Sequence, residues 1–258
     1  MTIQENIERI KSAKEDIRTA INEKGGTLAE DAKLSEFAEA VENMQSGQAI
    51  YMFGETMQDN GLGIRQIRTV IIRDGVTSVG DSAYSNTSIT SLVIPDSVKT
   101  LGKGICRSCP LLVSVTFPSS LKKMPNTFFA YCTALTSYSI PSHFEELEYA
   151  CFLQCTNIVK IEALGNLKAI GDYMFEGCSK LKVIKLKSVS SISATAFFAI
   201  NVDVVIDSPN PPFISGKFTN LGTNTKFYVP DDAVETYKSA TNWSAYADRI
   251  IKASEYIE

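Results

Sequence analysis

The sequence predicts an α+β fold: a solenoid of about six coils, with a helical hairpin before it and a helical cap after it. Three observations carry this prediction. A short strand motif recurs every 22 or 23 residues, columns of aromatic and cysteine residues keep the same register, and the two ends of the chain lack the repeat. A period of this length, sustained through more than half of a chain, is typical of a repeat architecture.

The repeating strand is an apolar-x-apolar triplet that is often followed by proline. Its offsets are 22, 23, 23, 23 and 23 residues. The triplets begin at Val70, Leu92, Val115, Tyr138, Ile161 and Ile184. In one copy the alternation directs Leu135, Tyr138 and Ile140 inward, and Ser137 and Ser139 outward. Because each unit is too small to bury its own apolar face, we expect residues 67–206 to stack into one shared core.

Two further columns follow the strand. Gly80, Gly102 and Gly171 come after an apolar residue, where we expect a turn with positive φ. Farther along each unit, after an aromatic position, stands a cysteine column, which Thr87 begins in the earliest copy. Its members are Cys109, Cys132, Cys155 and Cys178.

The cysteines allow a second interpretation. Cys106-x2-Cys109 and Cys151-x3-Cys155 have spacings that thiolate zinc ligands use. The steady register instead favours small buried side chains, two coils apart, that could not meet around one ion. We therefore expect a buried, reduced and metal-free column, with no metal or cofactor site.

These motifs resemble the BspA-like leucine-rich repeats, over about residues 67–206. The run from Ile170 to Cys178 (IGDYMFEGC) is nearest to the family pattern. Some copies depart from it: Pro125 and Glu148 replace the glycine, and Ile105-Cys106 replaces a small residue followed by an aromatic one. The resemblance implies a leucine-rich-repeat solenoid that serves in adhesion or recognition.

The C-terminal segment, residues 226–258, predicts the cap. Phe227 to Pro230 reads as a last strand, and Asp231 or Asp232 could N-cap a helix that carries Val234 and Tyr237. Aromatic and aliphatic residues then follow at helix-like spacing, as in the C-terminal cap of many BspA-like proteins. They are Trp243, Tyr246, Ile250 and Ile251. We expect Trp243 to pack in the core rather than serve as a ligand platform.

Residues 1–46 predict a separate helical module before the solenoid of residues 47–258. An apolar seam, broken by Lys14, follows a heptad pattern and could join two chains. It comprises Ile3, Ile7, Ile10, Ile17 and Ile21. A second helix around Leu34, Phe37 and Val41 could instead cover the seam. Ala13-Lys14, Ile17, Ala20-Ile21, Lys24-Gly25 and the run 34–38 resemble a helical module of some phage tail and minor structural proteins.

Charge and hydropathy exclude several classes of partner. The net charge is −4, with ten acidic and six basic residues in 1–46 and nineteen of each in the rest. Such a chain has no strong basic field, so we expect no nucleic-acid partner. No apolar run reaches the length of a membrane span. The first residues resemble no secretory signal, which favours a cytoplasmic or virion-associated location over a secreted one.

Residues for catalysis are sparse. His143, the single histidine, follows Pro141-Ser142 in a turn, where we expect it to be solvated. Glu145, Glu146 and Glu148 read as a solvated acidic edge rather than as an acid/base pair. We therefore expect no enzymatic activity and no catalytic residues.

The remaining prediction is a protein-interaction or adhesion module that binds a protein or cell-surface ligand. Its candidate face is the outward side of the strands: Ser91, Val93, Ser114, Thr116, Ser137, Ser139, Lys160, Glu162, Val183 and Lys185. The alternative is a phage-tail-like structural or receptor-binding protein that residues 1–46 attach or oligomerise.

Overall fold

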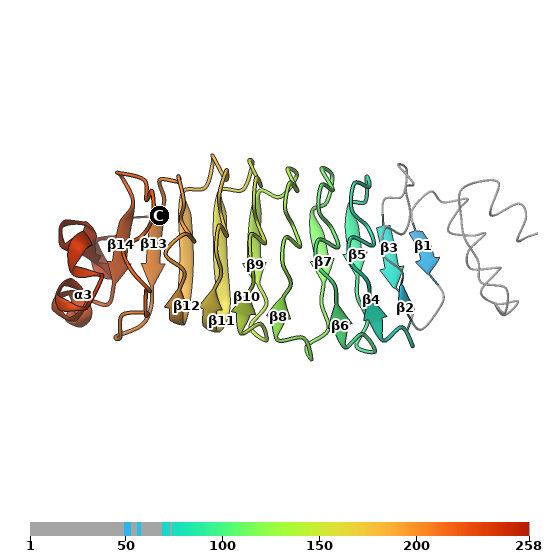
Figure 1. The fold of residues 1–258 in the computed structure, drawn as a ribbon, viewed down its shortest axis with the longest axis horizontal. Helices are drawn as coiled ribbons and strands as arrows, with labels where there is room; N and C mark the ends of the chain where they lie inside the picture. Colours follow the sequence, from blue (N-terminus) through green and yellow to red (C-terminus); the bar gives the residue numbers. More distant parts are fainter. Residues whose placement is uncertain (1–48, 53–55, 58–68, 73, 258) are drawn as a thin grey trace, which may run out of the picture.

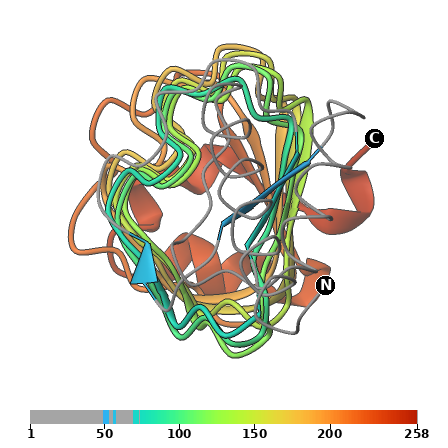
Figure 2. The ribbon, with the colours of Figure 1, turned by 90° about the vertical axis from the view of Figure 1, so that its right-hand side faces the viewer.

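The computed structural model describes residues 49–52, 56–57, 69–72 and 74–257, and over these residues the chain winds into about eight stacked coils. In Figure 1 the strands lie side by side along the long axis, and in Figure 2, along the stack, the coils superimpose. The predicted N-terminal helices and their seam, Ile3, Ile7, Ile10, Ile17 and Ile21, lie outside the described residues.

Parallel strands from the successive coils and from the C-terminal segment form a column that we call the strand column. Its members are β1 (Ala49–Met52), β3 (Thr69–Ile72), β5 (Ser91–Val93), β7 (Ser114–Thr116), β9 (Ser137–Ile140), β11 (Lys160–Ile170), β12 (Val183–Ile192), β13 (Asp203–Ile206), β14 (Lys226–Val229) and β15 (Ile250–Lys252). The hydrogen-bonded ladder is interrupted between β7 and β9. Aromatic rings pack in the core beside this interruption. The ring centroids of Phe117 and Phe144 are 5.0 Å apart, and those of Phe129 and Tyr138 are 4.8 Å apart.

A second column of two-residue strands runs along another side of the coils. Its members are β2 (Thr56–Met57), β4 (Ser78–Val79), β6 (Thr100–Leu101), β8 (Lys123–Met124) and β10 (Glu146–Leu147). The long strand β11 reaches both columns, since it pairs with β9 at its start and with β10 at Ala169 and Ile170.

The register confirms the predicted repeat and extends it. Val70 aligns with Leu92 and Val115, and Tyr138 aligns with Ile161 and Ile184. The ladder continues in a further coil at Val204, and at Phe227 and Ile250 in the C-terminal segment. The prediction of about six coils was therefore too low, because the step from Ile184 to Val204 is only 20 residues.

The core contains the aromatic column and the inward-facing strand residues that the sequence predicts. The rings of Phe129, Phe152, Phe175 and Phe197 stack at 5.4, 6.0 and 6.2 Å between centroids. Cys106 occupies the corresponding place one coil earlier and is also fully buried. Inward and outward positions in β9 and just before it are as predicted: Leu135 and Ile140 are 1% exposed, whereas Ser137 and Ser139 are exposed.

The glycine column serves a different purpose from the one predicted. Gly102 and Gly171 do not have positive φ. A Cβ atom on Gly102 would lie 2.5 Å from the Asp81 nitrogen, and one on Gly171 would lie 2.8 Å from Glu148 backbone atoms. The column is therefore glycine because neighbouring coils approach closely there. Positive φ occurs instead in other columns, one of which contains Ser82, Gly104, Thr127, Ala150 and Tyr173.

The C-terminal segment contains the one α-helix among the described residues, α3 (Val234–Ser239). It stands between the 3-10 turns η1 (Asp231–Ala233) and η2 (Ser244–Arg249), and η3 (Ala253–Glu255) follows β15. No side chain caps α3; Asp231 instead accepts hydrogen bonds from Ser254 at 3.1 and 2.6 Å. Ile250 and Ile251 lie in β15, so the helix-like spacing was misleading there. The indole of Trp243 is 1% exposed and donates to the Pro212 carbonyl at 2.7 Å.

Candidate interaction face

The outward side chains of the strand column lie mostly where the sequence predicts them. Ser114, Thr116, Ser137 and Ser139 are exposed, while Ser91, Val93, Lys160, Glu162 and Lys185 are half-buried. Val183 is the exception at 7% exposed. Its short side chain lies between Lys160 and Asp203 on the neighbouring strands, whose longer side chains flank it.

The face extends farther toward the C-terminus than the sequence indicates. Asp203 and Val205 of β13 continue its two rows, followed by Lys226 and Tyr228 of β14. Tyr256, in the turn that follows β15, covers the far end: its ring lies 5.0 Å from that of Tyr228 and 5.4 Å from the Lys185 ammonium. These outward positions were not predicted from the sequence because the repeat before Val204 is shorter than the others. The predicted strand at Phe227 could have indicated them.

The chemical character of the face changes along the stack. At β3 and β5 it carries hydroxyl groups, and the Ser91 hydroxyl donates to that of Thr69 at 3.0 Å. On β11 it becomes charged, with Lys160 and Glu162 forming an ion pair at 3.5 Å. We call the outward sides of β11, β12 and β13, with their flanking residues, the charged half of the face.

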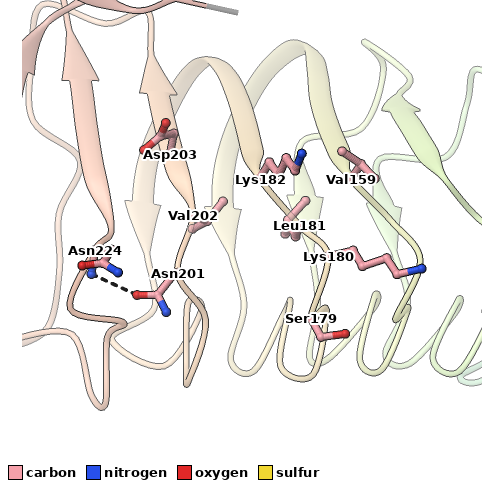
Figure 3. A pocket seen from close by; sticks show the side chains of 9 residues that line it. All are labelled: Val159, Ser179, Lys180, Leu181, Lys182, Asn201, Val202, Asp203 and Asn224. Carbon is pink, nitrogen blue, oxygen red and sulfur yellow. Dashed lines mark hydrogen bonds between the residues drawn. The ribbon is translucent and has the colours of Figure 1, made fainter.

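An open groove of about 730 Å³ lies where these three strands begin. It is lined by Val159, Ser179, Lys180, Leu181, Lys182, Asn201, Val202, Asp203 and Asn224. Figure 3 shows Leu181 and Val202 near its centre, with polar groups around them. The Asn201 side chain accepts a hydrogen bond from the Asn224 backbone at 2.9 Å. Burial raises the pKa of Asp203, against the opposing effect of Lys226.

A smaller groove of about 320 Å³ lies a few residues farther along, in the first half of β11 and β12 and at the end of β13. Its lining residues are Glu162, Ala163, Leu164, Lys185, Leu186, Lys187, Val205 and Asp207. Leu164 is 49% exposed there. Both grooves thus lie along the outward rows of β11 to β13, so they belong to the charged half of the face.

The cysteine column is buried, as the sequence predicts. Each thiol donates to a carbonyl of the preceding coil, for instance Cys155 to Phe129 at 3.1 Å and Cys178 to Phe152 at 3.0 Å. Burial raises the pKa of Cys132, and it raises that of Cys178 to about 12. Among the described residues, no three His, Cys, Asp or Glu side chains are grouped to hold a metal ion.

These thiols should be unreactive in the folded protein, because a buried neutral thiol is a poor nucleophile. A thiol reagent at neutral pH should label Cys132 and Cys178 only after denaturation. Mass spectrometry of native and urea-unfolded samples would measure this, with zinc determined on the same protein. Fast native labelling, or one bound zinc per chain, would show that the column is not a closed core.

Glu145 and Glu146 of the acidic cluster form ion pairs with lysines, whereas the sequence predicted a solvated edge. Glu145 contacts Lys168 at 2.6 Å, and Glu146 contacts Lys123 at 2.6 Å, each across neighbouring coils. The Lys168 hydrogen bond and charge lower the pKa of Glu145. A carboxylate held ionised in this way is not suited to act as a general acid.

His143 is half-buried, which corrects the prediction of a solvated turn. Its ring packs on Phe144 at 4.6 Å, and its Nε2 atom is buried without a hydrogen-bond partner among the described residues. Burial, and secondarily the charge of Lys122, lower the pKa of this imidazole.

The lowered pKa of His143 predicts a pH-dependent stability. Between its folded and unfolded pKa values the unfolded chain binds more protons, so the free energy of unfolding should fall as pH decreases below about 6.5. Urea midpoints of the wild type and His143→Gln, compared at about pH 7.5 and about pH 5.5, would measure the effect. The variant should show the smaller decrease. Equal decreases would mean that other groups cause the pH dependence.

Residues 77–203 match the model of the BspA type leucine rich repeat region in six copies. A leucine rich repeat protein of T. pallidum has a TM-score of 0.50 and 18% identity, over 74% of this chain and 87% of that one. A leucine-rich repeat protein from Bacteroides ovatus has a TM-score of 0.43 and 17% identity over 73% of this chain, which spans 56% of that protein.

No protein with a curated description matches the chain. No helix among the described residues is long and apolar enough to cross a membrane. At such identities the T. pallidum structure supports the fold alone, while the six matched copies within residues 77–203 agree with the repeating register described above. Residues 77–203 are therefore a BspA-type leucine-rich repeat region.

Proposed function

We propose that the chain is a non-enzymatic interaction or adhesion module that binds a protein or cell-surface ligand through the strand face. The supporting observation is the pair of grooves, one where β11, β12 and β13 begin and one a few residues farther along these strands. Leucine-rich-repeat solenoids present extended surfaces of this kind to partners. We place the centre of binding on the charged half, because charged rows fix the register and orientation of a partner.

The reactive groups of the described residues support a binding role over catalysis. The thiols are buried and held neutral by raised pKa values, and Glu145 and Glu146 are engaged by lysines. His143 lies against Phe144 rather than beside a nucleophile. Groups that must exchange protons or attack a substrate would need access and matched pKa values.

The two ends of the chain have proposed roles that serve this face. We propose that the residues after β14 cap the solenoid, with Trp243, Tyr237 and Tyr246 covering the last core rings. Self-association through Ile3, Ile7, Ile10, Ile17 and Ile21, or a phage-type attachment through residues 1–46, stays a prediction about residues outside those described. Light scattering of the full chain and of Ile10→Glu would test self-association.

Site-specific photocrosslinking tests the face. A photoreactive phenylalanine analogue at Lys185 should form an adduct with a cell-surface component, and the same analogue at Lys99, which lies off the face in the turn after β5, should not. Adding the reversal Lys182→Glu, in the larger groove, should remove the adduct because it inverts a charge beside the footprint. Equal adducts from Lys185 and Lys99, or an adduct unaffected by Lys182→Glu, would contradict binding through the charged half.

A further inference from the structure

The two grooves of the charged half share one arrangement of side chains. In each groove an exposed aliphatic residue of the β11 coil lies beside an exposed lysine of the β12 coil. Val159 and Lys182 form the first pair, since the Lys182 backbone donates to the Val159 carbonyl at 2.9 Å. Leu164 and Lys187 form the second, immediately after the first aligned stretch of β11 and β12. We call these the anchor pairs.

The anchor pairs expose groups that the fold itself does not use. Val159 is 37% exposed and Leu164 is 49% exposed, so neither contributes its whole side chain to the core. No ion pair joins either anchor lysine to a carboxylate among the described residues. Away from this face, by contrast, Lys123 and Lys168 each contact a glutamate of a neighbouring coil at 2.6 Å. An apolar surface and an available cation thus lie side by side at two points.

The charges around the anchor pairs favour an acidic partner. Six lysines lie on the grooves and the adjoining outward rows: Lys160, Lys180, Lys182, Lys185, Lys187 and Lys226. Only three carboxylates lie among them, although the whole chain has a net charge of −4. Complementary charge steers association and fixes the orientation of a partner.

The positions of the three carboxylates favour a protein over a uniform polyanion. Glu162, Asp203 and Asp207 are interspersed among the lysines, and Glu162 pairs with Lys160 at 3.5 Å. A nucleic acid or a sulfated glycan would place negative charge against these groups as well as against the lysines, and like charges in contact oppose binding. A protein segment can instead vary its charge from one residue to the next.

The spacing of the anchor pairs sets the length of the segment that reaches both. Val159 and Leu164 are five residues apart in nearly extended chain, which corresponds to roughly 16 Å. About five extended residues or about eleven helical residues span that distance. In the larger groove Leu181 and Val202 lie beside the first pair, so an apolar side chain placed there would contact more than Val159 alone (Figure 3).

We propose that the occupant of the charged half is an acidic, amphipathic segment of a protein partner, held at the two anchor pairs. At each pair an aliphatic or aromatic side chain packs on Val159 or Leu164, and an aspartate or glutamate accepts a hydrogen bond from Lys182 or Lys187. The apolar contact excludes water beside the ion pair, which strengthens the electrostatic attraction. This inference rests on the proposed function, because it names the class of partner for the same face.

Selection of peptides from a random dodecapeptide library displayed on phage, with the full chain as bait, tests the proposal. Enriched peptides should be acidic and should contain apolar residues. Synthetic copies should bind in solution with micromolar affinity, measured by fluorescence anisotropy. The proposal is overturned if no peptide is enriched, or if the enriched peptides carry no excess of aspartate and glutamate.

Charge variants locate the peptide on the anchor pairs. Lys182→Glu and Lys187→Glu should each weaken binding at least about tenfold, whereas Lys99→Glu, in the turn after β5, should not change it. Replacing the acidic residue of the peptide that faces Lys182 with lysine should restore affinity for Lys182→Glu. Equal affinities for the three lysine variants would overturn the proposal.

A matched pair of exposed valines tests the apolar contact. Val159→Ser should weaken binding at least about threefold. Val113→Ser should have no effect, since Val113 is 58% exposed in the turn before β7 and Thr136, not a lysine, takes the corresponding place one coil later. Both side chains are exposed, so neither variant should unfold the protein, and equal melting temperatures would verify this. An unchanged affinity for Val159→Ser would overturn the apolar contact.

Failure of this inference and failure of the proposed function give different results. If crosslinking at Lys185 captures a partner through a neutral or basic segment, the strand face binds a ligand and the acidic segment is wrong. The same conclusion follows if heparin fragments bind the chain and compete with the captured component. If crosslinking at Lys185 gives no adduct and no peptide is enriched, both proposals fail.

Discussion

Leu135→Ala is expected to lower the free energy of unfolding by about 2–5 kcal/mol. Leu135 is 1% exposed and packs in the shared core immediately before β9. Removing its side chain leaves a cavity between coils that cannot collapse without breaking the backbone ladder from β9 to β11. Urea unfolding followed by circular dichroism measures the loss, and the steepness of the transition shows whether the repeats still unfold together.

Ser137→Ala is the matched control, two residues farther along. Ser137 is exposed and faces outward, so its replacement should change the free energy of unfolding by no more than about 0.5 kcal/mol. Similar losses in the two variants would contradict the inward and outward assignment for the whole repeat.

Gly222→Ala is expected to cost about 3 kcal/mol, the upper part of the range for overpacking. A Cβ atom at this position would lie 2.1 Å from the Ile200 carbonyl oxygen and 2.4 Å from the Asn201 side-chain oxygen. The Gly222 backbone also donates to the Ile200 carbonyl at 3.0 Å, so separating the coils to admit a methyl group would lengthen that hydrogen bond.

Gly216→Ala provides the control for the loss of glycine flexibility. A Cβ atom there meets nothing within 4 Å, and the backbone has no positive φ. This variant should be neutral or stabilise the protein by up to about 1 kcal/mol, because alanine restricts the unfolded chain. Thermal melts of both glycine variants would measure the difference, and equal melting temperatures would refute a close approach of coils at Gly222.

Much of the fold could be predicted because a solenoid repeats its local pattern. The alternation around Tyr138 sets which side chains face the core, and a constant offset aligns one coil with the next. The buried cysteine column followed from the same register. Residues 1–46 are not tested by the described part of the chain, and their predicted helices stay a prediction.

The errors have physical causes. The coil at Val204 comes after a step of 20 residues, so a fixed period missed it. Ile250 and Ile251 have helix-like spacing from Trp243, but the ladder of β14 recruits them into β15. The glycine column led to the prediction of a turn with positive φ, but its positions are glycine because neighbouring coils approach closely there. The sequence of a single repeat unit does not show that approach.

The candidate site was harder to predict than the fold. Outward positions could be assigned by alternation, but the burial of Val183 depends on side chains from two other strands. The grooves and the contact between Lys185 and Tyr256 join segments far apart in sequence.

The central claim is that a partner binds across the charged half of the strand face. Lysine acetylation footprinting tests it most directly, using the full chain with and without the component captured by crosslinking at Lys185. Binding should protect Lys182, Lys187 and Lys226, which are exposed on or beside β12 and β14, and leave Lys99 and Lys103 unprotected. Protection confined to Lys99 and Lys103, or uniform across all five lysines, would contradict the claim.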